Sequence, residues 1–138
     1  MKILVPVDGS EYSLKAVESA CDLAKSQPPS ALTLMAVGIE LPELEEGRYI
    51  ADKMKSQAEA ALTRAKDVAQ KCGTVAEVLL ATGASPAEEI VKAAKDRKVD
   101  LIVIGSRGLA GKTSSFLGST AAKVVTYSPC SVLVVKSD

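Results

Sequence analysis

Hydrophobic residues gather in five short and nearly continuous runs along the 138-residue chain. A continuous run, unlike an alternating one, is typical of a strand that is buried on both faces, as in a parallel sheet. The runs therefore predict five parallel strands. These are Lys2–Val7, Ala31–Val37, Ala76–Ala81, Asp100–Ile104 and Ser131–Val135.

Helical spacing fills the segments between the runs, because apolar residues recur there every three or four positions. The stripes are Leu14, Val17, Cys21 and Ala24, then Met54, Ala58, Ala61, Leu62, Ala65, Val68 and Ala69, then Ala87, Ile90, Val91 and Ala94. Ser85 and Pro86 suit the N-cap and the first position of the third helix. A fourth helix is expected from about Ser119 to Tyr127, where Pro129 prevents its continuation.

Strict alternation of strands and helices predicts one α/β domain over residues 1–138, a three-layer α/β/α unit with a five-stranded parallel sheet. Ligands of such sheets bind beyond the carboxyl ends of the strands, where the winding reverses. Asp8, Gly38 and the segment from Gly105 follow three of these ends. The acidic, proline-containing stretch Glu40–Gly47 is predicted to be a surface loop.

Composition excludes several classes of function. Seventeen basic residues balance 17 acidic ones, which argues against a nucleic-acid partner, and four aromatic residues are too few for a base-stacking platform. The absence of histidine removes the usual catalytic triads and zinc sites. Cys21, Cys72 and Cys130 form no CxxC pair and are expected to be reduced thiols of a cytoplasmic protein. No run reaches the ~18 apolar residues that a membrane span needs.

The segment from Gly105 to Thr120 holds four of the nine glycines and runs from a buried strand to the start of a helix. Glycines let backbone N–H groups approach a phosphate closely, and a helix N-terminus adds unsatisfied donors. Arg107 adds positive charge to the segment. The run Gly111-Lys112-Thr113 is no P-loop, because Ser106 stands where that motif requires its first glycine.

The spacing of Gly105, Gly108, Gly118 and Ser119 matches Gly-x2-Gly-x9-Gly-[Ser/Thr]. This motif resembles the ATP-binding signature of the universal stress protein family. The resemblance extends over the chain, through Lys2–Ser10, Val99–Gly108 and Ser128–Val135. It implies an adenine nucleotide alpha hydrolase-like, Rossmann-type fold with the strand order 3-2-1-4-5.

The resemblance also implies a site for ATP, ADP or AMP, with Asp8 at the nucleoside, Val37 near the adenine and Gly118 in a phosphate clamp. The complete set is Pro6, Val7, Asp8, Val37, Gly105, Ser106, Arg107, Gly108, Gly118, Ser119 and Thr120. Asp8 or Ser10 could instead cap the first helix. Mg²⁺ is expected to arrive with the phosphates, because no cluster of three carboxylates offers a site of its own.

The last predicted strand would lie at an edge of the sheet, and neither proline nor charge guards it. We therefore expect a homodimer that pairs this strand with its own copy, assisted by Val124 and Val125. The pairing residues are Ser131, Val132, Leu133, Val134 and Val135.

These inferences favour an ATP-binding, dimeric regulator of the stress response. Without histidine, no general base is in evidence beyond Asp8 or a loop glutamate, so at most slow ATP hydrolysis is expected. Two alternatives stay open, a nucleotide-free protein-interaction module and an adenylating enzyme of the same architecture.

Overall fold

The computed structural model describes residues 1–40, 45–108 and 117–136, and for residues 45–49 it describes the backbone alone. Strands and helices alternate along these parts of the chain. The elements are β1 (Lys2–Pro6), α1 (Glu11–Ser26), β2 (Ala31–Ile39), α2 (Glu45–Lys71), β3 (Ala76–Gly83), α3 (Pro86–Asp96), β4 (Leu101–Gly105), α4 (Ser119–Tyr127) and β5 (Ser131–Val135). Each predicted strand and helix is present, so the α/β class predicted from the hydrophobic pattern is confirmed.

All of the strand pairs in the sheet are parallel, and the strand order is β3-β2-β1-β4-β5. This confirms the order 3-2-1-4-5. In the centre, Leu4 of β1 is in register with Thr33 of β2 on one side and with Ile102 of β4 on the other. The winding reverses between β1 and β4, so the carboxyl ends of these two strands flank the position at which such folds bind ligands.

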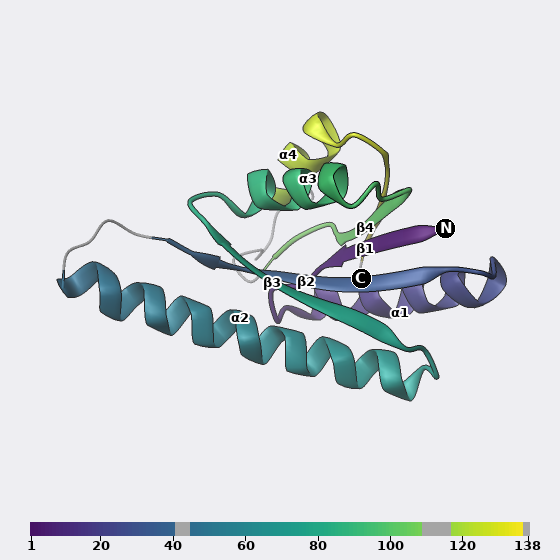
Figure 1. Cartoon of the computed structure of the whole chain (residues 1–138), viewed down its shortest axis with the longest axis horizontal. Coiled ribbons are helices and arrows are strands. Elements are labelled where there is room, and N and C mark those ends of the chain that lie inside the picture. Colours follow the sequence, from purple (N-terminus) through teal and green to yellow (C-terminus); the bar gives the residue numbers. More distant parts are fainter. Residues whose placement is uncertain (41–44, 109–116, 137–138) are drawn as a thin grey trace.

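Helices cover both faces of the sheet, with α1 and α2 on one face and α3 and α4 on the other (Figure 1). Successive residues of a strand point to opposite faces. Val5 accordingly packs in the core that contains Val17 and Ala65, whereas Leu4 packs in the core that contains Ile90. The need to fill two cores explains why the strands are continuously apolar.

Two helices begin as the sequence predicts. Ser10 is the N-cap of α1, and its hydroxyl accepts a hydrogen bond from the N–H of Ser13 at 3.2 Å. Ser85 is the N-cap of α3, where its hydroxyl accepts from the N–H of Glu88 and Pro86 takes the first helical position. The alternative in which Ser10 caps the first helix is therefore correct, and Asp8 is left for another role.

The loop prediction for Glu40–Gly47 is wrong at its far end, because α2 already begins at Glu45. Residues 41–44 lie outside the described residues. Acidic residues are common in surface loops and also in the first turn of helices, so the composition of this stretch does not distinguish the two. The acidic residues and the proline of this stretch therefore did not locate the start of α2.

One residue that was expected to assist pairing at the β5 edge of the sheet is buried. Val124 of α4 is fully buried in the core beneath α3 and α4, so it is not part of an exposed edge surface. Val125 and Leu133 are exposed instead, at 45% and 39% of their surface. Successive residues of a helix point in directions about 100° apart, so Val124 faces the core while Val125 faces solvent, and the prediction that both valines assist the dimer overlooked this.

Candidate functional site

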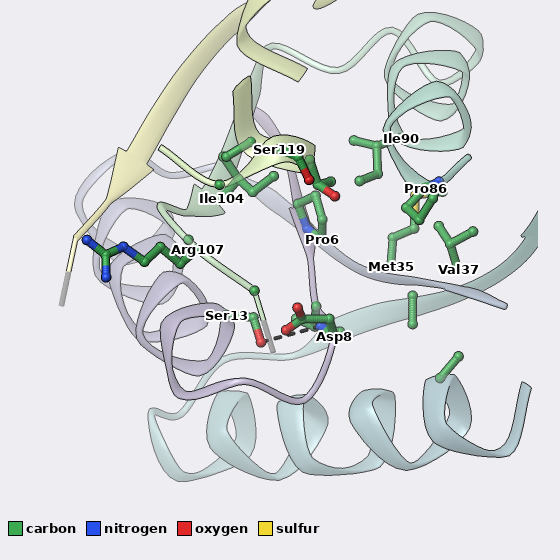
Figure 2. Close-up of a pocket in the computed structure, with 18 of the residues that line it drawn as sticks. Pro6, Asp8, Ser13, Met35, Val37, Pro86, Ile90, Ile104, Arg107 and Ser119 are labelled. Carbon is green, nitrogen blue, oxygen red and sulfur yellow. Dashed lines mark hydrogen bonds between the residues drawn. The ribbon is translucent and has the colours of Figure 1, made fainter. Parts of the chain in front are cut away.

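A cleft of about 710 Å³ opens at the carboxyl ends of β1, β2 and β4. Its volume lies within the roughly 300–1,000 Å³ that small-molecule sites occupy. Two helices, α3 and α4, begin at its margin, and the middle of α2 closes another side. Figure 2 shows the residues of β1, β2 and α3 converging on this space.

Ten of the eleven predicted site residues line the cleft. They are Pro6, Val7, Asp8, Val37, Gly105, Arg107, Gly108, Gly118, Ser119 and Thr120. The parallel sheet assembles them, because the ends of β1, β2 and β4 and the start of α4 meet at one edge. Their roles toward a ligand stay predictions.

Ser106 is the exception, because it is buried and does not line the cleft. Its N–H donates to the carbonyl of Val135 at 2.8 Å, and its own carbonyl accepts from the N–H of Gly118 at 2.7 Å. It therefore ties the glycine segment to β5 and to the start of α4. Arg107 does border the cleft, yet its side chain extends away from Asp8 and the apolar residues (Figure 2).

Asp8 sits at the turn between β1 and α1. Its Oδ1 accepts a hydrogen bond from the N–H of Ser10 at 2.9 Å, and its own N–H donates to the hydroxyl of Ser13 at 3.4 Å. Gly9 between them has a φ of +88°, a left-handed conformation that glycine adopts without a steric penalty. These contacts hold the carboxylate at the mouth of the cleft.

Gly108 lies directly against this carboxylate. A Cβ atom at Gly108 would be 2.6 Å from Oδ2 of Asp8, and contacts between real Cβ atoms and their neighbours are longer. Glycine at this position lets the chain after β4 pass beside Asp8. The sequence motif identified Gly108, but its physical reason is a contact with Asp8, in the turn after β1, and Asp8 is not part of the motif.

Gly105 and Gly118 have a different steric reason. A Cβ at Gly105 would be 2.8 Å from the carbonyl carbon and oxygen of Tyr12, in the first turn of α1. A Cβ at Gly118 would be 3.1 Å from the Ser106 oxygen and from Cα of Arg107. Both glycines therefore permit close approach of backbone to backbone. Gly111, Lys112 and Thr113 lie outside the described residues.

The start of α4 faces the cleft without a side-chain cap. Ser10 and Ser85 cap α1 and α3, but the N-cap of α4 is Gly118, which has no side chain to fill that role. The first N–H groups of a helix have no partner within it, and with the dipole they attract anions. The hydroxyls of Ser119 and Thr120 stand in the same turn and add further donors.

The apolar side of the cleft was largely missed in the sequence. Met35 and Ile104, which are almost fully buried, and Pro86 and Ile90 of α3 line it together with Val37. The helical stripe identified Ile90 as core, and the residue is in fact both core and cleft lining. The helix α2 adds a further group, Met54, Gln57 and Ala58. Pro86 could have been found from its place three residues after the end of β3, at the start of the helix that follows the strand.

Arg64 is a second residue that sequence reasoning missed. From the exposed side of α2, its Nη1 donates to the carbonyl of Gly9 at 2.9 Å. The contact fixes the turn that carries Asp8. No short motif reveals it, because the donor and the acceptor belong to elements that are distant in the sequence.

Candidate metal ligands are scarce in the part of the cleft that the structure describes. Within the described residues, no three His, Cys, Asp or Glu side chains gather closely enough to hold one. Asp8 supplies the carboxylate in the described lining.

None of the described helices combines the length and the apolar character that crossing a bilayer requires.

Comparisons with known proteins agree over nearly the whole chain. A model of the universal stress protein family matches residues 1–136. Universal stress protein YxiE of Bacillus subtilis (strain 168) is 38% identical over 150 residues, which span 98% of this chain and 98% of the relative.

Solved structures show the same likeness. Universal stress protein UspA from Lactobacillus plantarum has a TM-score of 0.84 at 28% identity, covering 98% of this chain and 97% of that one. A universal stress protein crystallised in complex with cAMP has a TM-score of 0.75 at 28% identity, covering 100% and 98% of the two chains.

Proposed function

The chain belongs to the universal stress protein family, and from that premise we propose that its cleft binds an adenine nucleotide. The observation that carries the proposal is the division of the cleft, which is apolar at β2 and α3 and rich in hydrogen-bond donors at the start of α4. A nucleotide has the same division between its base and its phosphates. The relative that was crystallised with cAMP supports the choice of adenine.

The base belongs on the apolar side. Val37 and Ile90 approach from β2 and α3, and Met35 forms the buried floor between them. Binding of a flat heteroaromatic ring is favourable when apolar side chains remove its faces from water. Polar atoms at its rim would then select adenine over other bases.

The ribose and the phosphates belong on the polar side. Asp8 provides a carboxylate that can accept hydrogen bonds from the ribose hydroxyls. The uncapped first turn of α4, with Ser119 and Thr120, supplies donors to the phosphate oxygens. Gly108 and Gly118 let the backbone come close to the ligand.

We further propose that ATP binds with Mg²⁺, which the phosphates rather than protein side chains would hold. The described lining has the Asp8 carboxylate and no cluster of carboxylates, which suits an ion that arrives with the nucleotide. The ion would neutralise phosphate charge. Because Asp8 is already engaged by the N–H of Ser10, hydrolysis would be slow at most, and the nucleotide would act as a conformational ligand of a cytoplasmic regulator.

A calorimetric titration with AMP, ADP, ATP with Mg²⁺, and GTP tests the proposal. The adenine nucleotides should bind at micromolar to millimolar concentration, and GTP at least tenfold more weakly. Asp8→Asn should weaken AMP binding about tenfold, because hydrogen bonds to charged groups contribute ~1.5–3 kcal/mol. Asp67→Asn is the matched control, since Asp67 pairs with Lys71 on the exposed face of α2.

The same titration separates the two alternatives. Absence of heat and of thermal stabilisation with every nucleotide at millimolar concentration would contradict the proposal and favour an interaction module. Release of pyrophosphate in step with modification of an acceptor would favour an adenylating enzyme.

We propose in addition that β5 pairs with its own copy in a homodimer. Leu133 exposes 39% of its surface on this edge strand, and Val125 and Tyr127 of α4 are exposed nearby. Leu133→Lys should convert the dimer to a monomer in sedimentation equilibrium. Val78→Lys is the control, because Val78 is 48% exposed on β3 at the opposite edge. A dimer that survives Leu133→Lys would contradict this interface.

A further inference from the structure

Two cysteines that are distant in the sequence meet where α2 ends. Cys21 lies on α1 and is fully buried, and Cys72, which directly follows α2, is half-buried. Cys72 is near enough to Cys21 to raise the pKa of the Cys21 thiol. Cys72 also packs against the hydrophobic cluster that contains Cys21. The fold therefore creates a dithiol that no CxxC motif announces.

The backbone, and not only the side chains, sets this proximity. The N–H of Cys72 donates to the carbonyl of Val68, and the N–H of Thr74 donates to the carbonyl of Ala69, so the chain folds back on the end of α2. A Cβ at Gly73 would be 3.8 Å from Nζ of Lys25, which lies one turn beyond Cys21 on α1. The turn after α2 therefore lies beside α1, about one turn from Cys21.

The two sulfurs differ in their access to solvent. Burial raises the pKa of the Cys21 thiol above its ordinary value, and the neighbouring Cys72 raises it further. Cys21 is therefore a protonated, shielded thiol at neutral pH. Cys72 is partly exposed, so a small dissolved oxidant reaches Cys72 first.

We propose that Cys21 and Cys72 form a modification site at which a hydroperoxide produces an intramolecular disulfide. The Cys72 thiolate attacks one oxygen of hydrogen peroxide and the O–O bond breaks, so that Cys72 becomes a sulfenic acid and the leaving hydroxide takes up the proton that the Cys72 thiol had released, giving water. The Cys21 sulfur then attacks the Cys72 sulfur, the S–O bond breaks, and the hydroxyl leaves with the thiol proton as a second water. Two thiols and one hydrogen peroxide thus give one disulfide and two waters.

The disulfide would join α1 to the turn that follows α2, and these two helices cover one face of the sheet (Figure 1). It would close a loop of about fifty residues, which restricts the unfolded chain and raises the stability of the oxidised protein. The proposal does not depend on nucleotide binding, because neither cysteine lines the cleft.

Cys130 provides an internal comparison. It packs in the core beneath α3 and α4, on the opposite face of the sheet from Cys21. Its Sγ lies 3.6 Å from the hydroxyl of Ser128. The sheet separates Cys130 from the dithiol, so Cys130 should take no part in the intramolecular bond.

The test uses the full chain with Cys130→Ser, treated with a small molar excess of hydrogen peroxide. Mass spectrometry without reductant should show the loss of two hydrogens. Trypsin should then release one cross-linked species, which joins peptide Ala16–Lys25 to peptide Cys72–Lys92. Oxidation should also raise the melting temperature, and dithiothreitol should reverse both changes.

Two variants separate the roles of the sulfurs. With Cys72→Ser, peroxide should leave Cys21 unmodified, because that thiol is shielded. With Cys21→Ala, Cys72 should accumulate as a sulfenic acid that dimedone traps. Since Cys72 is half-buried, its serine variant tests the proposal even where the Cys21 variant folds poorly. Oxidation of Cys72 to a sulfinic acid without the cross-linked peptide, or a disulfide only between two chains, would overturn the proposal.

Discussion

The two sides of the cleft are built on different principles. On the apolar side, Met35 and Ile90 belong to the core that α3 and α4 cover, and the cleft is a place where that core reaches the surface. On the polar side, Asp8 and Gly108 are held by turns, by backbone hydrogen bonds and by a close steric contact. On the apolar side, the same residues therefore serve both core packing and ligand binding. On the polar side, different residues serve these two roles.

This difference makes the effect of substitutions predictable. A change on the apolar side should reduce stability and affinity together, because one side chain serves both. On the polar side, an added side-chain atom that meets backbone should reduce stability. An added atom that meets a side chain able to rotate should reduce ligand affinity and leave stability unchanged. The four predictions below test this distinction from the largest effect to the smallest.

Gly105→Ala should reduce the free energy of unfolding by about 3 kcal/mol, because the new Cβ would meet the Tyr12 backbone, which cannot rotate away. Urea denaturation measures this loss. A loss below about 1 kcal/mol would contradict the view that this glycine serves the packing of α1 against β4.

Gly108→Ala should weaken AMP binding about tenfold, or about 1.4 kcal/mol, while the free energy of unfolding changes by less than about 0.5 kcal/mol. The Cβ opposes a carboxylate oxygen of Asp8, which can rotate, so the ligand contact is lost and the fold is kept. Calorimetry and urea denaturation on the same samples give both values. Equal affinity for AMP in the variant and the parent protein would remove Asp8 from the proposed site.

Ile90→Val should lower the free energy of unfolding by about 1 kcal/mol, since one buried methylene is removed. Because Ile90 also lines the cleft, adenosine and AMP should both bind about threefold more weakly, by the same factor. The matched comparison is Gly108→Ala, which should weaken both ligands by the same factor without a loss of stability, because the displaced Asp8 carboxylate is proposed to contact the ribose that both ligands carry. A variant that loses stability with unchanged adenosine affinity would show that the base does not contact α3.

Arg64→Ala should have the smallest effect, about twofold in AMP affinity, with a change of less than about 0.5 kcal/mol in stability. The side chain is exposed and makes one hydrogen bond to Gly9, so its loss loosens the Asp8 turn without emptying the core. Lys66→Ala on the same helix removes an equal, exposed charge and should leave the affinity unchanged. Identical losses in both variants would attribute the effect to charge alone.

The parts of the fold that could be predicted are those that local chemistry specifies. Continuous apolar runs gave the strands, and Ser85 with Pro86 marked the start of α3 because a hydroxyl cap and a missing N–H both suit that position. The far end of Glu40–Gly47 was assigned wrongly because the same acidic residues suit a loop and a first helical turn. The dual role of Ile90 was missed because a helical stripe does not tell a core face from a cleft wall.

The sequence by itself determined the alternation of elements, the class of the fold and the glycines at which the chain must pass closely. Only the tertiary structure decided that Gly108 abuts Asp8, that Arg64 holds Gly9 and that Cys72 meets Cys21. Strands and helices depend on residues a few positions apart, so their pattern can be read along the chain. The three contacts depend on sheet register and on helices packed across the sheet, which bring together residues that have no periodic relation in the sequence.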